Sequence, residues 1–344
     1  MVLLRQTRVY QSGQDGYHTY RIPAVVTTRK GALLAFCEGR KNSSSDTGEI
    51  DTLVKRSTDA GRTWSEQQVV VHRDGFTIGN PCPVIERKSG TIWLPLTANP
   101  ATATEKQIRA GGGTRTAWLT HSRDDGRTWA PVTEITSSVK DPTWAWYATG
   151  PGVGIHMRTG RLLVPCDHSV LSDGTDHSHV IYSDDQGRTW AIGGVAGDHT
   201  DESQVAELSD GTLLLNMRSY AGRNRRAIAR SRDGGLSWSK VELDETLIEP
   251  VCQASLVTYA KDELLFSNPA DTVRDRMTVR LSRDGGRTWP VRRLLHGGPA
   301  AYSCLTVLHD RTIGCLYERG NQHPYEEITF ARFNLDWLTE PPVA

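Results

Sequence analysis

The sequence predicts an all-β protein, a six-bladed β-propeller built of four-stranded antiparallel blades. The first observation behind this prediction is an eight-residue turn that starts with Ser, places Asp two residues later and Gly two residues after that, and ends with Trp. The five copies occupy residues 57–64, 122–129, 183–190, 231–238 and 282–289. Their first serines are 48 to 65 residues apart, which is the length of a four-stranded blade and not of a helical hairpin.

Each residue type in this turn has a physical role. The Asp side chain can accept backbone N–H bonds, the Gly can adopt a positive φ, and the Trp can anchor the turn by packing. The five aspartates are therefore predicted to be structural. Because the third strand of each blade runs away from the face that holds the site, these turns are expected on the opposite face.

A second repeat consists of paired apolar strands joined at a tight corner, and it occurs six times. The pairs are 22–26 with 32–36, 84–85 with 91–94, 153–155 with 161–164, 205–208 with 212–215, 255–258 with 263–266, and 305–308 with 312–315. The sixth unit lacks the Ser/Asp/Gly/Trp turn. We expect residues 327–330 and 7–10 to complete it, which would close the ring and protect its edges.

Composition narrows the possible functions. The repeats run through the 344 residues without a linker, which predicts one domain over 1–344. Forty basic against forty acidic residues argue against nucleic acid or an anionic membrane as the main partner. No stretch is long enough for a transmembrane segment, and residues 1–5 are too short for a signal peptide. The expected location is therefore cytoplasmic, or secreted if a leader has been removed.

No cofactor and no metal are predicted. The six cysteines form no C-x-x-C pair and mostly lie in or beside apolar strands, so we interpret them as buried free thiols.

Antiparallel pairing sends the start of each first strand and the end of each second strand to one face. Arg21, Glu202 and Tyr302 lie on first strands and should converge at the mouth of the central channel. Arg218 joins them from a second strand, and Arg274 or Arg276 from a loop. Several guanidiniums around one opening favour a carboxylate or phosphate ligand, although any single arginine could simply pair with a surface carboxylate.

The same topology brings further polar residues to that face. They are Arg40, Asn80, Asn99, His168, Gln253, Asn268 and Glu318. The polar loop 41–48 reaches it too, and Asp46 in that loop could swing over a ligand as a proton donor. The alternative for Asp46 is an ordinary loop residue that caps a turn.

These residues resemble a known family. Residues 20–23, Tyr-Arg-Ile-Pro, resemble the arginine-isoleucine-proline motif of sialidases, and the five turns resemble the Asp boxes of that family. The resemblance covers essentially the whole chain, and the family motif often begins with Phe where this chain has Tyr20. Further matching segments are the Ser-Ser-Asp loop ending at Asp46, residues 202–204, residues 216–218 and residues 301–303.

The resemblance implies a retaining exo-α-sialidase that acts on terminal sialic acid of sialylated glycans. Arg21, Arg218 and Arg274 would clamp the sialic acid carboxylate, with Arg276 as the alternative third member. Tyr302 would be the nucleophile, Glu202 its base and Asp46 the acid/base, while Glu318 would orient Arg21 and Arg40 would contact the sugar. Residues implied to line the remaining pockets are Asn80, Trp144, Trp146, Tyr147 and His168.

The chemistry leads to two expectations about pKa values. A phenol has an ordinary pKa of about 10, so the arginine cluster is expected to favour the phenolate of Tyr302. The pKa of Asp46 is expected to be raised, because an acid catalyst must carry a proton. A trans-sialidase, a Kdn-preferring sialidase and a non-catalytic glycan-binding propeller remain alternatives.

Overall fold

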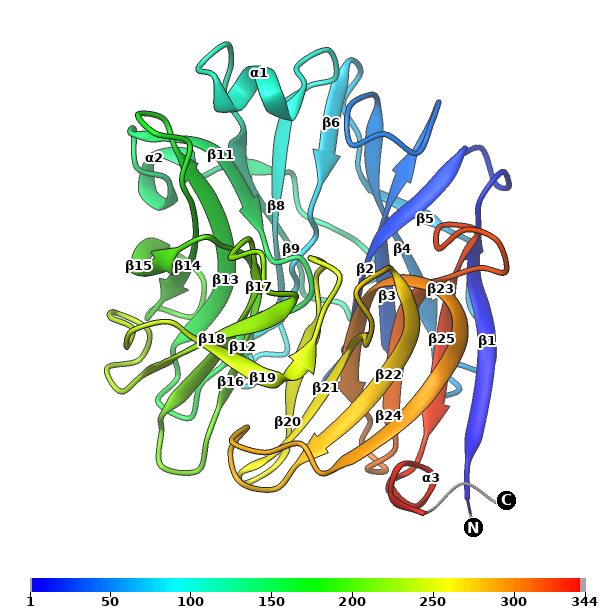
Figure 1. The fold of residues 1–344 in the computed structure, drawn as a ribbon. Helices are drawn as coiled ribbons and strands as arrows, with labels where there is room; N and C mark the ends of the chain where they lie inside the picture. The colour runs from blue at the N-terminus through cyan, green and yellow to red at the C-terminus, as the bar shows by residue number, and fades with distance from the viewer. Residues whose placement is uncertain (1, 341–344) are drawn as a thin grey trace.

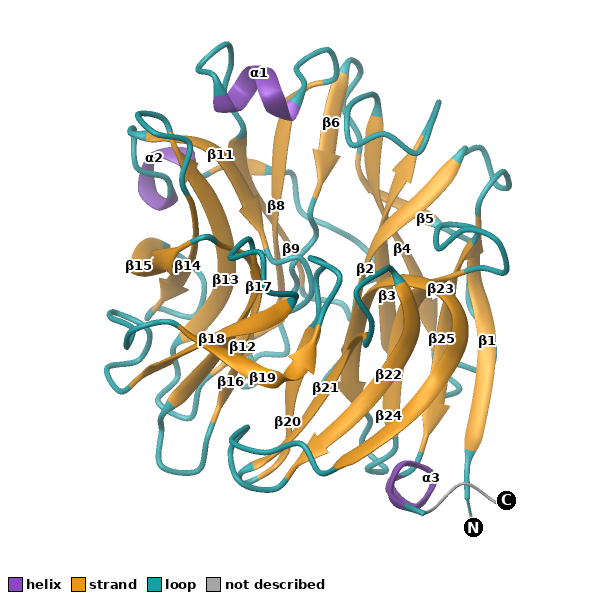
Figure 2. Cartoon of the chain, viewed as in Figure 1, coloured by secondary structure: helices purple, strands orange, loops and turns teal. Residues whose placement is uncertain are grey.

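The structure is a computed structural model that describes residues 2–340, and its regular elements are almost entirely strands (Figure 1; Figure 2). Three short helices, α1 (Glu105–Arg109), α2 (Thr136–Val139) and α3 (Leu335–Thr339), lie at the periphery. Within the described residues, no helix has the length and apolar character needed to cross a membrane. The architecture is therefore all-β, as the sequence predicted.

The first sheet contains the first two predicted hairpins. Its nine strands are β2 (Thr19–Thr27), β3 (Leu33–Arg40), β4 (Ile50–Ser57), β5 (Gln68–Val71), β6 (Phe76–Gly79), β7 (Val84–Ile85), β8 (Ile92–Pro100), β9 (Thr116–Ser122) and β10 (Thr133–Glu134). The order along the sheet is β10-β9-β8-β6-β4-β3-β2, with β5 beside β4 and β7 beside β8. The two hairpin units meet where β4 and β6 pair in parallel at Ile50 and Thr77.

Two separate sheets hold the next two repeats. The first consists of β11 (Trp144–Thr149), β12 (Ile155–His156), β13 (Leu162–Val170), β14 (Asp176–Ser183) and β15 (Ala191–Asp198). The second consists of β16 (Thr200–Glu207), β17 (Leu213–Ser219), β18 (Arg225–Ser231) and β19 (Glu242–Ile248). In the first, β11 and β12 pair with successive parts of β13, so together they replace one interrupted strand.

The last sheet joins the two ends of the chain. Its strands are β1 (Leu4–Gln11), β20 (Ser255–Ala260), β21 (Glu263–Pro269), β22 (Asp275–Ser282), β23 (Val291–Val307), β24 (Ile313–Arg319) and β25 (Glu327–Phe333). The long strand β23 pairs with β22 through residues 291–299 and with β24 through residues 300–307. β1 pairs with β25, with Thr7 opposite Phe330, so the N-terminal strand does complete the last repeat as predicted.

All six strand pairs predicted from the sequence are present. Figure 1 shows the repeats standing side by side in the order of the sequence, from blue through green to red. Strand β16 lies against β20, β20 lies against β23, and β23 lies against β2. The first strands of successive repeats are thereby brought together, which positions the polar residues at their ends.

The five Ser/Asp/Gly/Trp turns have the predicted hydrogen bonds. In the first, Asp59 Oδ1 accepts from the backbone N–H groups of Arg62 and Thr63, both at 3.0 Å, and the Gly61 N–H donates to Ser57 Oγ at 2.9 Å. Burial acts to raise the pKa of the turn aspartates, but these hydrogen bonds outweigh it and lower the pKa of all five to about 2.

Two of the tryptophans that end these turns pack against a neighbouring repeat. The ring of Trp64 lies 5.4 Å from that of Phe330 in β25, and the ring of Trp129 lies 5.6 Å from that of Phe36 in β3. The hydrophobic core is therefore distributed between adjacent repeats. All six cysteines are buried and free, as predicted.

Candidate active site

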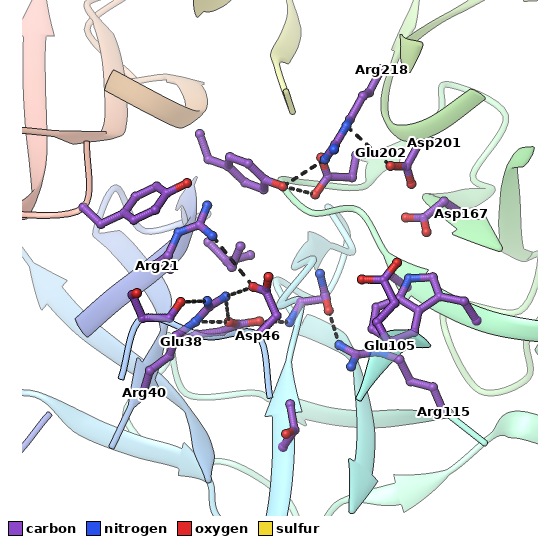
Figure 3. Close-up of a pocket in the computed structure, with 18 of the residues that line it drawn as sticks. Arg21, Glu38, Arg40, Asp46, Glu105, Arg115, Asp167, Asp201, Glu202 and Arg218 are labelled. Atoms are coloured by element: carbon purple, nitrogen blue, oxygen red, sulfur yellow. Dashed lines mark hydrogen bonds and ion pairs between the residues drawn. The ribbon is translucent and has the colours of Figure 1, made fainter. Parts of the chain in front are cut away.

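A polar pocket of about 290 Å³ gathers eight of the nine predicted site residues. They are Arg21, Arg40, Asp46, Asn80, Glu202, Arg218, Arg274 and Tyr302. The ninth, Glu318, is fully buried behind Arg21. Figure 3 shows several of these side chains pointing toward a common centre. None of the residues that line the pocket belongs to the five repeated turns.

Tyr302 and Glu202 form the shortest contact in the reactive part of the pocket. The Tyr302 hydroxyl donates to Glu202 Oε1 at 2.5 Å, and Arg218 Nη1 donates to Glu202 Oε2 at 2.8 Å and to the Tyr302 hydroxyl at 3.3 Å. Both Tyr302 and Glu202 are buried. The phenol therefore has a proton acceptor within hydrogen-bond distance and a cation beside it.

The pKa values of this pair are both raised. Burial, followed by the charge of Glu202, raises the pKa of Tyr302 well above its ordinary value, while Arg218, Arg274 and Arg21 act in the opposite direction. The arginines therefore favour the phenolate as expected, but burial and Glu202 outweigh them. Burial also raises the pKa of Glu202, against the effect of Arg218, and a more basic carboxylate is a better acceptor for the phenol proton.

Glu318 ties Arg21 to the strand that carries Tyr302. Arg21 Nε and Nη2 donate to its two carboxylate oxygens at 3.1 and 3.3 Å. The same carboxylate accepts from the backbone N–H groups of Ile22 at 2.9 Å and of Tyr302 at 3.0 Å. Glu318 thereby holds Arg21 through both of its carboxylate oxygens and joins β24 to β2 and β23.

Arg274 is the third arginine in the pocket. Its Nη1 donates to the hydroxyl of Tyr325 at 2.6 Å, and its Cζ lies 5.5 Å from the centre of the Tyr302 ring. Arg21 Cζ lies 4.9 Å from that same ring centre. Arg276 is exposed and is not among the residues that line the pocket, so the structure favours Arg274 over Arg276.

Asp46 lies in the loop between β3 and β4 and is held by two arginines. Its Oδ1 is 2.6 Å from Arg40 Nη2 and 3.7 Å from Arg21 Nη1, and its side chain is 65% exposed. Partial loss of solvent around the carboxylate acts to raise the pKa of Asp46, but the positive charges of Arg40 and Arg21 lower it by more. The expected rise in the pKa of Asp46 is therefore wrong for this structure.

β-Bulges aim three of these side chains into the pocket. The strand register shifts between residues 21 and 24, between 200 and 203, and between 300 and 303. A bulge bends the strand and redirects the side chains beside it. The same irregularity in three repeats thus turns Arg21, Glu202 and Tyr302 toward one point, and Ile22 in the first bulge has a φ of 61°.

The pocket also contains residues that sequence reasoning missed. They are Glu38, Glu105, Arg109, Arg115, Asp167, Asp201, Tyr220 and Tyr325. Glu38 could have been found, because it lies two residues before Arg40 and so on the same face of β3. Asp201 could not, because only the bulge brings it into the pocket beside its neighbour Glu202. Glu105 and Tyr325 lie in segments that have no counterpart in the other repeats.

One wall of the pocket is acidic and lies across from Arg21 and Arg40 (Figure 3). Burial and the neighbouring carboxylates of Asp201 and Glu202 raise the pKa of Asp167 well above its ordinary value. Asp201 accepts a hydrogen bond from Tyr220 at 2.7 Å and lies 3.5 Å from Arg218 Nε. The pocket therefore presents cations on one side and carboxyl groups on the other.

Of the predicted aromatic and histidine lining, only Trp146 reaches the pocket. Trp144 stacks on His168 with ring centres 3.6 Å apart, and Tyr147 packs in the same cluster between two sheets. The prediction is wrong for these three residues, and the reason is a register shift between residues 144 and 147 of β11. Residues 2–340 contain no group of three or more His, Cys, Asp or Glu side chains placed to hold a metal ion.

Comparison with known proteins agrees with the fold and the pocket. Residues 31–316 match the family described as the BNR repeat-like domain. Sialidase-2 of Mus musculus is 31% identical over 360 residues, which cover 94% of each chain. The sialidase of Micromonospora viridifaciens is 37% identical over 357 residues, which cover 95% of this chain and 53% of that protein. The chain belongs to the sialidase family.

Solved structures extend the comparison to the backbone. The structure titled "Hadza microbial sialidase Hz136" is 37% identical with a TM-score of 0.89, over 97% of this chain and 69% of that one. A Trypanosoma rangeli sialidase titled as a covalent intermediate with 2,3-difluorosialic acid has a TM-score of 0.79 at 21% identity, over 96% of this chain and 59% of that one. This chain spans only 53% and 62% of the Micromonospora viridifaciens and Bacteroides fragilis sialidases.

Proposed function

We propose that this protein is an exo-α-sialidase that removes terminal α-linked sialic acid from glycoproteins, glycolipids or oligosaccharides with retention of configuration. The contact that most supports this function is the 2.5 Å hydrogen bond from the Tyr302 hydroxyl to Glu202, in a pocket lined by Arg21, Arg218 and Arg274. Three guanidiniums suit a sugar that carries a carboxylate. A phenol paired with a carboxylate is a nucleophile with its base.

In the proposed first step the three arginines hold the sialic acid carboxylate and the Tyr302 oxygen attacks the anomeric carbon. Glu202 takes the phenol proton as the new carbon–oxygen bond forms. The bond to the leaving group breaks, and Asp46 gives its proton to the departing oxygen. In the second step Asp46 removes a proton from water, water attacks the anomeric carbon, and the Tyr302 oxygen leaves and regains its proton from Glu202.

A tyrosine suits this substrate better than a carboxylate nucleophile. The anomeric carbon of sialic acid bears its own carboxylate, so an attacking Asp or Glu would bring a second anion against it. A neutral phenol avoids this repulsion, and sialidases are a recognised exception to the usual pair of carboxylates for this reason.

Substrate binding is expected to raise the pKa of Asp46, as an acid catalyst requires. Arg21 and Arg40 lower its pKa. A substrate carboxylate placed on Arg21 would neutralise part of that positive field and add a negative charge nearby, and both changes raise the pKa of Asp46. The substrate would thereby help to protonate its own acid catalyst.

We also propose that the chain forms one six-bladed propeller, the single domain predicted over 1–344, of which residues 1 and 341–344 lie outside the described residues. Six hairpins of the same pattern support this count, as does β23, which serves as the last strand of one repeat and the first of the next. The pairing of β1 with β25 and the contact of β2 with β23 are what a closed ring requires. A crystal structure with an open gap between β2 and β23 would contradict it.

Replacement of Tyr302 by Phe tests the covalent step. The parent protein should form an adduct with a 2,3-difluorosialic acid that mass spectrometry detects, and Tyr302→Phe should form none and lose most turnover. Tyr325→Phe is the matched control, because this second pocket tyrosine contacts Arg274 but not Glu202. Undiminished turnover by Tyr302→Phe would refute the assigned nucleophile.

Leaving-group dependence tests Asp46. Asp46→Ala should slow release of a poor leaving group such as lactose far more than release of an activated aryl group, because only the poor leaving group needs a proton. Equal losses would contradict its role as acid. Analysis of the products with added lactose separates hydrolysis from sialyl transfer, and a Kdn glycoside in the same assay tests the preference for that sugar.

A further inference from the structure

Arg115 is a buried cation in the pocket wall, and none of the residues described pairs it with a carboxylate. It is 3% exposed. Its Nε donates to Thr97 Oγ1 at 3.0 Å, its Nη1 to Asn99 Oδ1 at 2.6 Å, and its Nη2 to Asn80 Oδ1. All three acceptors are neutral. Burial lowers the pKa of Arg115 and outweighs carboxylates such as Glu38 and Glu105, which act on Arg115 without contacting it. A buried cation whose direct partners are all neutral is unfavourable, so this arrangement needs a functional explanation.

The effect of Arg115 on Asn80 follows from hydrogen-bond chemistry. A guanidinium group only donates, so the side-chain atom of Asn80 that faces it must be the oxygen. Thr97 Oγ1 lies 3.2 Å from the same oxygen. Rotation of the amide by half a turn would set its NH₂ group against the guanidinium and lose a charge-assisted bond.

The backbone of Asn80 is equally fixed. Its N–H donates to Glu38 Oε1 at 2.9 Å, its carbonyl accepts from Thr149 Oγ1 at 2.6 Å, and its φ is 54°. The Nδ2 group of Asn80 has no partner among the described residues, and Asn80 lines the pocket. Its two N–H bonds are therefore available to a bound ligand.

We propose that Arg115 is a positioning residue that locks the Asn80 carboxamide with its NH₂ group toward the pocket. This inference rests on the proposed function and deepens it. The wall at Asn80 then accepts a carbonyl or hydroxyl oxygen of the sugar and rejects a group that only donates, such as an ammonium. Arg115 lies across the pocket from Arg218 (Figure 3) and touches neither Tyr302 nor Glu202, so its main effect is on binding. Its charge also lowers the pKa of Asp46, and a substrate with an activated aryl leaving group, which needs no proton from Asp46, keeps this effect out of the test.

A double-mutant cycle tests this role. Arg115→Met removes all three hydrogen-bond donors, and Arg115→Lys keeps the positive charge but loses the planar guanidinium that bonds three acceptors at once. With a fluorogenic sialoside, Arg115→Met should raise KM about 3- to 10-fold, the effect of one lost hydrogen bond, with little change in kcat. Arg115→Lys should raise KM by a smaller factor. In an Asn80→Ala background Arg115→Met should have almost no further effect on KM. Equal increases in both backgrounds would overturn the proposal.

A second measurement needs no activity and so separates this inference from the proposed function. The side-chain amide signals of Asn80 in a ¹⁵N spectrum, assigned by their loss in Asn80→Ala, should shift in Arg115→Lys. The amide of Asn216, whose oxygen accepts from buried Arg226 at 2.7 Å, is the matched control and should not move. Unchanged Asn80 signals in Arg115→Lys would refute the lock, whether or not the protein hydrolyses sialosides.

Discussion

Replacement of Glu318 by Gln should weaken both the fold and the site. Its buried carboxylate accepts four hydrogen bonds, two from Arg21 and two from backbone N–H groups. Removal of one partner of a buried ion pair costs about 3–5 kcal/mol. Glutamine can still accept one or two of the bonds, each worth about 1 kcal/mol. Asp46, 3.7 Å from Arg21 but mostly exposed, compensates little. We therefore expect a loss of about 3 kcal/mol.

Urea unfolding followed by tryptophan fluorescence measures this loss directly. Glu249→Gln is the matched control, because Glu249 is also fully buried and pairs with Arg226 at 2.7 Å outside the pocket. Both variants should lose stability by a similar amount, but only Glu318→Gln should raise KM for a sialoside. A loss below about 1 kcal/mol for Glu318→Gln would show that solvent or a neighbouring group replaces the carboxylate, and would refute this reasoning.

Three further changes test the turns and the cationic wall. The pKa of Asp59 is about 2 in the folded protein and about 3.9 in the unfolded chain. The ionised Asp59 side chain therefore stabilises the fold fully above about pH 4, and this stabilisation disappears as the pH falls through about 2. Asp59→Asn should therefore be less stable than the parent in urea near neutral pH, and the difference should shrink as the pH falls toward 2. A constant difference would contradict this. An added Cβ at Gly61 would lie 2.3 Å from the phenylalanine ring in β25. Gly61→Ala should therefore lower the free energy of unfolding by about 1–3 kcal/mol more than Gly13→Ala, because Gly13 has a similar φ but open space around it. Equal losses would mean that the turn shifts freely to make room. Arg274→Ala should raise KM for a sialoside about 10-fold and Arg276→Ala should not change it, and the reverse result would reassign the third arginine.

The local parts of this protein could be predicted because local residues determine them. The turn at Asp59 needs only a serine, an aspartate and a glycine within five residues, and its hydrogen bonds do not extend beyond the turn. Hairpin pairing depends on neighbouring apolar segments in the same way. From these repeats and antiparallel geometry alone, the sequence placed Arg21, Glu202 and Tyr302 at one end of their strands.

The electrostatic state of the site could not be predicted. At Tyr302 the arginines lower the pKa as expected, but burial raises it by more. At Asp46 the expectation is a raised pKa, yet two guanidiniums lower it. These effects depend on distances and on burial, which no motif contains.

The amino-acid sequence by itself determined the all-β repeat, the paired strands and the kind of side chain available at each strand end. Only the tertiary structure decided that Arg274 and not Arg276 enters the pocket, that Trp146 faces it while Trp144 packs against His168, and that Arg115 orients Asn80. The physical reason is that bulges, register shifts and contacts between separate repeats set these directions. Each of them depends on residues far apart in the chain.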